Sequence, residues 1–159
     1  MLFRSLNLIA EDAEILSGCR AEKILTPHVG ELARLLHMTI AECQRDPAGS
    51  AGRAAEKYQA CCVRKDSVTV TAEEGREQYY INKSGSSALA SAGSGDVLAG
   101  ITGAFAAKRQ CEKNEKKISL AKTAALAAYA HGKAGEAAEE KSSASYVTAS
   151  EIIRGLQSI

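Results

Sequence analysis

The sequence predicts a single α/β domain, and three observations lead to this fold class. Short apolar stretches run directly into polar loops, two β-rich stretches flank a glycine turn, and a long helical pattern begins at a run of small residues. Strands and helices that alternate in this way form a three-layer α/β arrangement. A length of 159 residues suits one domain with its own core, so we expect residues 1–159 to form a single domain.

The first elements are a helix, a strand and a loop. Residues 6–16 predict a short helix, and residues 23–25 predict a brief strand. That strand runs into Thr26-Pro27-His28-Val29-Gly30-Glu31, where proline cannot continue a ladder and glycine marks a turn. From Glu31 onward, leucines recur at helical spacing. Because the loop follows the carboxyl end of a strand, it lies where ligands bind in open α/β sheets.

The middle of the chain predicts a helix and three further strands. Residues 42–59 are polar and alanine-containing, and within them a helix is expected from Pro47 or later to Tyr58. A strand is expected at residues 61–63. The β-branched stretch 67–71 and the tyrosine-rich stretch 78–81 predict a hairpin that turns near Gly75.

Small residues lead into the next helix at residues 89–105. Gly93 and Gly95 permit backbone angles that side chains forbid and allow another molecule to approach the main chain. Amides at the start of a helix attract anions, because unpaired N–H groups and the positive end of the dipole converge there. Asp96, in the first turn, is either a helix-capping carboxylate or a catalytic base beside a bound phosphate.

The last part of the chain is helical. The helix that begins near Val97 is expected to end near Lys108, and the charged segment 108–117 predicts a solvated connection rather than a nucleic-acid patch. An alanine-rich helix is expected over residues 118–139. Thr148 with Glu151 three residues later predicts a capping box for a final helix.

Composition narrows the classes of function. A net charge of +1 offers no global attraction for nucleic acid or an anionic membrane. No apolar run approaches the ~20 residues that span a bilayer, and the first residues lack a signal-peptide layout, so we expect a cytoplasmic protein. Five cysteines in a spacing that matches no zinc pattern predict buried or half-buried free thiols.

The three histidines are weighed separately. His28 lies in the loop at the end of a strand, where a structural and a functional role are about equally supported. His37 and His131 fall in helical stretches and are interpreted as ordinary packing or surface residues.

Two motifs carry a resemblance to a known family. Thr26-Pro27-His28-Val29-Gly30-Glu31 and Gly93-Ser94-Gly95-Asp96-Val97-Leu98-Ala99-Gly100 resemble those of the NAD(P)H-hydrate dehydratases, in the ribokinase-like superfamily. The likeness runs from about Leu6 onward and corresponds to the carboxyl-terminal half of the family domain. It therefore implies a partial, three-layer ribokinase-like α/β fold.

The resemblance implies an activity and its residues. The family dehydrates hydrated NADH and NADPH with ATP or ADP as the phosphoryl donor, and a magnesium ion accompanies the nucleotide. By this likeness His28 contacts the hydrated dinucleotide, and Asp96 faces its hydroxyl group and acts as the catalytic base. The amides of Ser94, Gly95 and Asp96 would stabilise the charge that develops on the phosphoryl group. The adenine nucleotide would be held by Lys65, Asp66, Ser67, Val68 and Thr69, together with Ser94 and Gly95.

The departures from the family pattern lead to further expectations. Asp66 stands where the family has glycine, and a carboxylate there repels phosphates unless it turns away or meets the metal. Half of a domain exposes a sheet edge and an apolar face, so we expect the chain to form a homo-oligomer or to pair with an amino-terminal half. On its own it is expected to be partly active or inactive.

Two other functions stay open at this point. A ribokinase-like kinase acting on a vitamin precursor or a sugar would share the Gly-Ser-Gly-Asp turn. A degenerate module that binds adenine nucleotide without catalysis would also keep that turn. A kinase leaves a stable phosphorylated product, whereas a dehydratase releases free phosphate.

Overall fold

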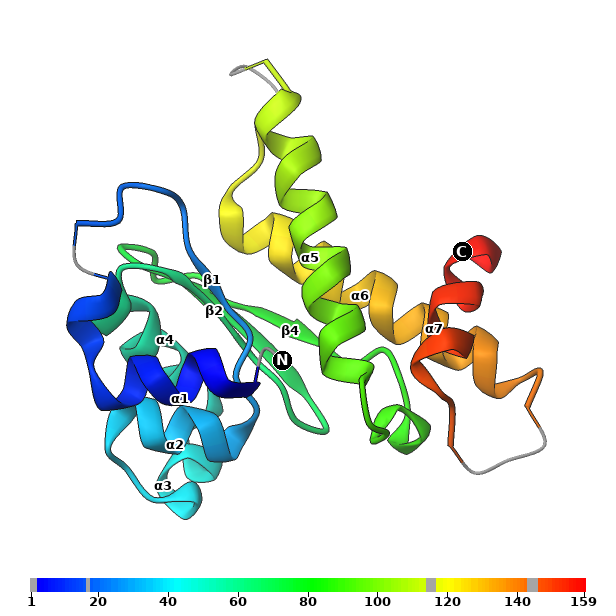
Figure 1. Cartoon of the computed structure of the whole chain (residues 1–159), viewed down its shortest axis with the longest axis horizontal. Helices are drawn as coiled ribbons and strands as arrows, with labels where there is room; N and C mark the ends of the chain where they lie inside the picture. Colours follow the sequence, from blue (N-terminus) through cyan, green and yellow to red (C-terminus); the bar gives the residue numbers. More distant parts are fainter. Residues whose placement is uncertain (1–2, 17, 114–116, 143–145) are drawn as a thin grey trace. The chain divides into compact units, whose positions relative to one another are not determined.

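The β-rich stretches of the chain pair into one mixed sheet in the order β1-β2-β3-β4 (Figure 1). The computed structural model describes residues 3–16, 18–113, 117–142 and 146–159. Strand β1 is parallel to β2, with Leu25 opposite Cys62, and β2 is antiparallel to β3, with Cys62 opposite Ala72. The strands are β1 (Ile24–Leu25), β2 (Cys61–Arg64), β3 (Thr69–Glu73) and β4 (Tyr80–Asn82). The predicted hairpin is confirmed, because β3 and β4 are neighbours in the sheet.

The chain divides into two compact units, Met1–Ile81 and Asn82–Ile159. Each unit has its own core and is described by itself. The expectation of one domain over residues 1–159 stays a prediction.

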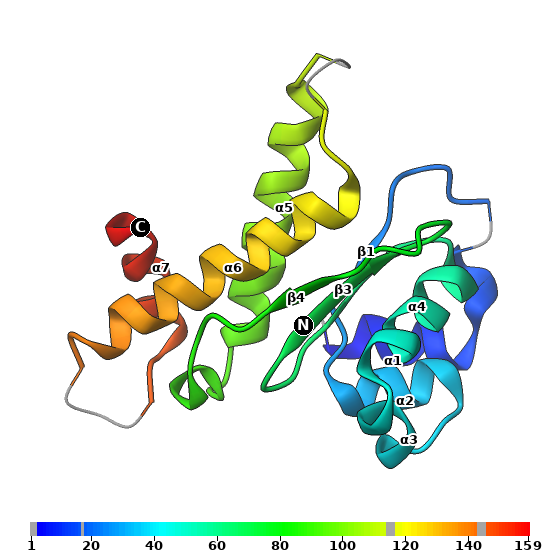
Figure 2. The same ribbon diagram turned by 180° about the vertical axis from the view of Figure 1, so that it is seen from behind.

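Helices α2 and α4 build the core of the first unit. Helix α4 (Pro47–Tyr58) lies against β2 and β3, as both views show (Figures 1 and 2). Its predicted bounds are confirmed, because proline fits the first helical position and the Asp46 side chain accepts a hydrogen bond from the Gly49 amide at 2.8 Å. The other helices of this unit are α1 (Phe3–Glu11), η1 (Ala13–Leu16), α2 (Val29–Leu36) and α3 (Ile40–Arg45).

The buried face of the sheet meets these helices. Leu32 on α2 and Cys62 on β2 are both fully buried in one cluster with the alanines of α4. Burial of a side chain the size of leucine contributes about 1.5–3 kcal/mol. The same burial raises the pKa of the Cys62 thiol to about 12. The five cysteines, all of which lie among the described residues, are free as predicted, but only Cys43, Cys61 and Cys62 are buried; the expectation of burial is wrong for Cys19 and Cys111, which are exposed.

The second unit is helical. It contains η2 (Ser87–Leu89), α5 (Ser94–Cys111), α6 (Leu120–Glu139), α7 (Ala149–Gly155) and η4 (Leu156–Ser158). Small residues let α6 approach its neighbours: a Cβ added to Gly155 would lie 2.2 Å from the Ala134 carbonyl oxygen. The predicted capping box is confirmed, because Thr148 caps α7 and the Glu151 side chain accepts a hydrogen bond from the Thr148 amide.

Several boundaries differ from the sequence predictions; β3 and β4, for example, lie one to two residues later than the stretches 67–71 and 78–81. The helix expected over residues 6–16 is divided into α1 and η1, and a short helix at Ile40–Arg45 was missed. Helix α5 extends beyond Lys108 to Cys111, because its last turn contains residues that favour helix formation. The alanine-rich helix starts at Leu120, where the Ser119 side chain caps it. The expected connection 108–117 therefore begins later, and its residues 114–116 lie outside the described residues.

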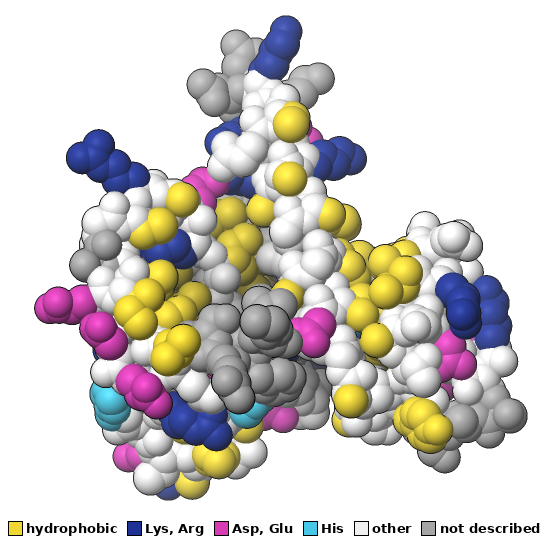
Figure 3. Space-filling model, viewed as in Figure 1, with side chains coloured by type: hydrophobic (Ala, Val, Ile, Leu, Met, Phe, Trp, Pro, Cys, Tyr) yellow, Lys and Arg dark blue, Asp and Glu magenta, His cyan; other side chains and the backbone are white. Residues whose placement is uncertain are grey.

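Some large apolar side chains are exposed on each unit, and apolar groups are visible across the face in Figure 3. Ile15 and Ile40 are exposed on the first unit, and Tyr129 and Ile153 on the second. Across the described ranges, none of the helices combines the length and apolar character that crossing a membrane requires.

Candidate functional site

The Thr-Pro-His loop is built around an unusual helix cap. His28 precedes α2, and its Nδ1 atom accepts hydrogen bonds from the amides of Gly30 (3.1 Å) and Glu31 (3.2 Å). The Glu31 carboxylate in turn accepts the His28 amide proton at 2.8 Å, which completes a capping box. This cap explains why α2 begins at Val29 rather than at the expected Glu31.

The protonation of His28 follows from this geometry. An atom that accepts two amide hydrogen bonds carries no proton, so the proton of the neutral ring lies on Nε2. The side chain is 41% exposed. His28 thus combines a structural role with a partly exposed ring, whose Nε2 atom lies 3.6 Å from the Glu31 carboxylate.

The loop lies beside the predicted nucleotide segment. The Lys65 amide donates to the Pro27 carbonyl oxygen at 2.8 Å, and His28 and Lys65 form a parallel β-bridge. Residues 65–69 connect β2 to β3, and Thr69 is the first residue of β3. The structure therefore brings the predicted substrate-binding histidine and the predicted nucleotide segment together in the first unit.

Asp66 does not present an uncompensated charge in this segment. Its carboxylate accepts a hydrogen bond from Arg64 Nη2 at 3.0 Å and another from the Ser67 amide at 2.8 Å. The expected repulsion of phosphates assumed a free carboxylate, whereas the structure turns it toward a cation.

Arg64 is the residue of this segment that the sequence analysis missed. Its side chain is only 3% exposed, at the end of a fully buried strand. Among the described side chains, Arg64 Nε is the buried polar atom without a hydrogen-bond partner. A charged residue directly after three buried strand positions was the available signal.

The glycine turn begins α5 without a side-chain cap. Gly93 is the N-cap residue and has a φ of 85°, which explains glycine at this position. The Ser94 amide donates to the Ser91 carbonyl at 3.3 Å, and the Asp96 amide donates to the Gly93 carbonyl at 3.1 Å. In the described part of the chain, the Gly95 amide has no such partner. One of the three predicted anion-binding amides is therefore left unpaired by the fold.

Asp96 is exposed in the first turn of α5. Its carboxylate has no hydrogen bond or ion pair with any residue in the described ranges, and it does not cap the helix. Asp96 therefore makes no capping hydrogen bond, although its charge in the first turn still interacts favourably with the helix dipole, and the carboxylate is accessible to accept a proton from a ligand.

Ser94 is buried and faces α6. His131 Nε2 lies 3.2 Å from Ser94 Oγ and 3.1 Å from the Ser94 carbonyl oxygen, and the two residues are 9% and 6% exposed. The Ser91 hydroxyl also donates to the Val147 carbonyl, which ties the preceding residues to the segment before α7. From the sequence, His131 was interpreted as an ordinary packing or surface residue, and no local pattern indicates its contact with Ser94.

Residues 84 and 85, in the loop before the glycine turn, are hydrogen-bonded to α6. The Ser84 hydroxyl lies within hydrogen-bond distance of Asn82 Oδ1 (2.9 Å) and of the Tyr129 carbonyl oxygen (3.1 Å). The Gly85 amide donates to the Glu136 carboxylate at 2.7 Å. Hydrogen bonds from Lys133 and Gly85 keep the pKa of Glu136 below its usual range, so this carboxylate stays charged.

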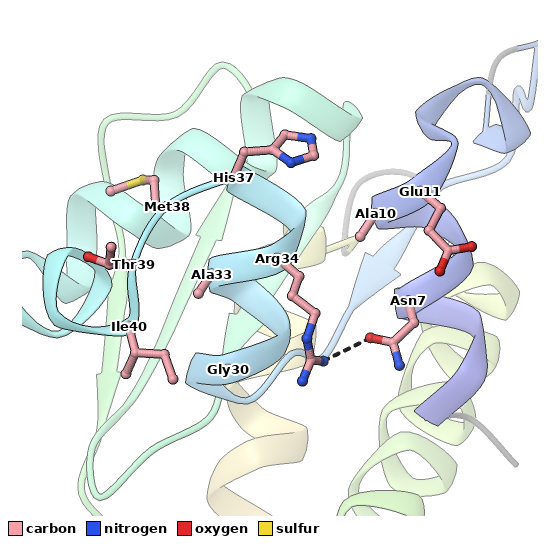
Figure 4. Close-up of a pocket in the computed structure, with 10 residues that line it drawn as sticks. All are labelled: Asn7, Ala10, Glu11, Gly30, Ala33, Arg34, His37, Met38, Thr39 and Ile40. Atoms are coloured by element: carbon pink, nitrogen blue, oxygen red, sulfur yellow. Dashed lines mark hydrogen bonds between the residues drawn. The ribbon is translucent and has the colours of Figure 1, made fainter.

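A cavity of about 780 Å³ opens on another part of the first unit. Figure 4 shows its lining from α1, α2, residues 37–39 and the first residue of α3, with Arg34 donating to Asn7 Oδ1 at 2.9 Å. It borders the Thr-Pro-His loop at Gly30 but contains none of the predicted site residues.

The predicted site residues fall into two groups. His28 and residues 65–69 belong to the first unit, and Ser94, Gly95 and Asp96 belong to the second. No set of three or more His, Cys, Asp or Glu side chains that could hold a metal ion occurs among the described residues. Magnesium in nucleotide sites is held largely by phosphates and water, so no protein ligand is assigned.

Comparison with known proteins identifies what the chain is similar to. A family model described as NAD(P)H-hydrate dehydratase matches residues 4–158. The bifunctional NAD(P)H-hydrate repair enzyme of Moorella thermoacetica is 41% identical over 84% of this chain and 24% of its own length. The ADP-dependent (S)-NAD(P)H-hydrate dehydratase of Neisseria meningitidis is 36% identical over 86% of this chain and 44% of its own.

A solved structure agrees with these relatives. The ADP/ATP-dependent NAD(P)H-hydrate dehydratase of Bacillus subtilis, co-crystallised with ATP and Mg²⁺, aligns with a TM-score of 0.73 at 31% identity. The alignment covers 86% of this chain and 46% of that structure, so the chain spans less than half of its length. Ribokinase-like proteins at 22% identity share the fold as well. The prediction of a partial ribokinase-like α/β fold is thereby confirmed.

Proposed function

This chain belongs to the NAD(P)H-hydrate dehydratase family, and we propose that it serves the ATP- or ADP-dependent dehydration of hydrated NADH and NADPH. The observation that carries this proposal is the exposed, unpartnered carboxylate of Asp96 beside the unpaired amide of Gly95. A base next to an anion-binding amide suits phosphoryl transfer from a nucleotide to a hydroxyl group.

The proposed reaction proceeds in two steps. Asp96 accepts the proton of the ring hydroxyl as its oxygen attacks the terminal phosphorus, and the bond from that phosphorus to the nucleotide oxygen breaks. The nucleotide leaves shortened by one phosphoryl group, as ADP or AMP. The ring carbon–oxygen bond then breaks, so that this oxygen departs as part of phosphate, and loss of a proton from the adjacent ring carbon restores the double bond of NADH or NADPH.

The other residues receive binding roles in this proposal. The Gly95 amide would stabilise charge on the transferred group, with Ser94 alongside it. Residues 65–69 would hold the adenine nucleotide, and Nε2–H of His28 would donate to the hydrated dinucleotide. Mg²⁺, when bound with the nucleotide, neutralises part of the phosphate charge.

Assembly and location complete the proposal. We propose one domain over residues 1–159 that associates with a second copy or with an amino-terminal half of the same kind of domain, in the cytoplasm. The exposed side chains of Ile15, Tyr129 and Ile153 support association. A clean monomer by light scattering at micromolar concentration would contradict it.

The first test is binding. ATP or ADP with Mg²⁺, at about 100 times its dissociation constant, should stabilise the folded chain by about 2.7 kcal/mol and raise its unfolding temperature. No shift with either nucleotide would show that this chain does not bind nucleotide by itself.

The second test is catalytic. Incubation with hydrated NADH and ATP should produce NADH and free phosphate in equal amounts, whereas a kinase would leave a phosphorylated product. Asp96→Asn should lower the rate by about 10²–10⁴-fold and leave nucleotide binding intact. Asp12→Asn removes the same charge from an exposed site in the first unit and should leave the rate unchanged. Equal rates for Asp96→Asn and the wild type would refute the assigned base.

A further inference from the structure

The start of α5 lacks the support that helix starts usually have. Its N-cap residue, Gly93, offers no side chain, and the cap makes no side-chain hydrogen bond. A cap of serine, threonine or aspartate contributes about 0.5–2 kcal/mol. The turn that carries Gly95 and Asp96 must therefore be held in another way if it is to keep one geometry.

His131 provides a contact at this position. Its Nε2 atom lies within hydrogen-bond distance of two atoms of Ser94, the carbonyl oxygen at 3.1 Å and the hydroxyl oxygen at 3.2 Å. A carbonyl oxygen only accepts, so a hydrogen bond between Nε2 and the Ser94 carbonyl requires the ring proton to lie on Nε2, with the hydroxyl oxygen as a second acceptor within reach. This fixes the main chain of the first helical residue as well as its side chain.

The contact reaches the turn from a separate, well-anchored helix. His131 is 9% exposed on α6, and Ser94 lies 37 residues earlier in the chain. Gly132, next to His131, packs so closely that an added Cβ would lie 2.6 Å from the Ser84 carbonyl carbon. Helix α6 thus holds both the loop that precedes the turn and the first residue of α5.

We propose that His131 is a positioning residue for the turn Gly93–Asp96: its Nε2–H donates a hydrogen bond to the Ser94 carbonyl oxygen and thereby sets the direction of the Gly95 amide and the Asp96 carboxylate. His131 touches neither nucleotide nor dinucleotide in this role and acts through Ser94. The inference rests on the proposed function for its effect on nucleotide binding, while its effect on the turn is independent of that function.

The matched variants are His131→Leu, which removes the donor, and His131→Gln, whose amide nitrogen reaches about the position of Nε2. In the full chain, hydrogen exchange of the Asp96 and Val97 amides should become about tenfold faster in His131→Leu, the effect of losing one hydrogen bond. Amides near the start of α6, such as that of Ala124, should be unaffected, and His131→Gln should retain most of the protection. Equal acceleration along all of α6, or none at Asp96, would overturn the proposal.

The same variants separate this inference from the proposed function. The dissociation constant for ATP with Mg²⁺ should rise about tenfold in His131→Leu and much less in His131→Gln. An unchanged dissociation constant despite faster exchange at Asp96 would refute the link to binding. If the wild type binds no nucleotide, the proposed function fails for this chain, and the exchange result alone decides whether His131 positions the turn.

A measurement on the wild type covers the case in which His131→Leu does not fold. Nitrogen NMR of the His131 ring should find the proton on Nε2. A ring protonated only on Nδ1 could not donate to the Ser94 carbonyl and would overturn the proposal.

Discussion

Two glycines on neighbouring helices of the second unit should respond in opposite ways to the same substitution. A Cβ added to Gly132 on α6 would lie 2.1 Å from Ser84 Oγ, 2.6 Å from its carbonyl carbon and 2.7 Å from its carbonyl oxygen. Two of these three atoms are backbone, so rotating the Ser84 side chain cannot relieve the clash. A Cβ added to Gly103 on α5 would meet nothing within 4 Å, and this residue is exposed.

The magnitudes follow from two opposing effects. Alanine in place of glycine in a helix interior is favourable by about 1 kcal/mol, and both sites gain this. Overpacking costs about 1–3 kcal/mol, and the upper value applies where backbone must move. Gly132→Ala should therefore lower the free energy of unfolding by about 2 kcal/mol, and Gly103→Ala should raise it by about 1 kcal/mol.

Urea unfolding of the two variants and the wild type measures both effects, and thermal unfolding should move by about 2–4 °C per kcal/mol. The loop that leads to the glycine turn is the segment that must shift in Gly132→Ala. A Gly132→Ala variant as stable as the wild type would refute the close approach of this loop to α6. Gly103→Ala serves as the control for helix propensity alone.

Three further predictions concern thiols, a buried ion pair and a helix cap. A thiol reagent at mildly alkaline pH should label Cys19 and Cys111 rapidly in the folded chain, because the other three thiols, Cys43, Cys61 and Cys62, are buried. All five thiols should react after denaturation. Rapid labelling of all five without denaturant would contradict this packing. Asp66→Asn should lower the free energy of unfolding by about 3 kcal/mol, because it leaves the Arg64 charge buried without its partner. Adding Arg64→Leu to the same chain should recover most of this loss. Additive losses of the two substitutions in urea unfolding would argue against an Arg64–Asp66 ion pair. Hydrogen bonds from the Thr148 amide and hydroxyl hold the pKa of Glu151 below its ordinary value of 4.5. Because the pKa of Glu151 is lower in the folded chain, this stabilisation is present above pH 4.5 and is lost as the pH falls through the folded pKa. The unfolding temperature of Glu151→Gln should therefore fall less with acid than that of the wild type.

Local signals in the sequence determined much of the secondary structure. The span Pro47–Tyr58 and the cap formed by Thr148 and Glu151 were predictable because proline geometry and capping hydrogen bonds act within one helical turn. The same signal was present but overlooked at α3, where Thr39 and Glu42 form a capping box. The two motifs also predicted the family and the fold, since each keeps its residues within one short stretch.

Tertiary structure decided how the candidate site is held. His28 was noticed as a loop residue, yet its role as a cap depends on a backbone turn that brings two amides to Nδ1. The pairing of Asp66 with Arg64 depends on the turn after β2, which bends the carboxylate back onto a buried guanidinium.

The contact of His131 with Ser94 joins residues 37 positions apart. A hydrogen bond at that separation forms only where packing brings two helices together, and no local pattern encodes it. The sequence by itself determined which residues could do the chemistry, because capping, turn and helix signals act over a few residues. The tertiary structure decided which donors, acceptors and charges are engaged and which are left available to a ligand, because that depends on contacts between distant segments.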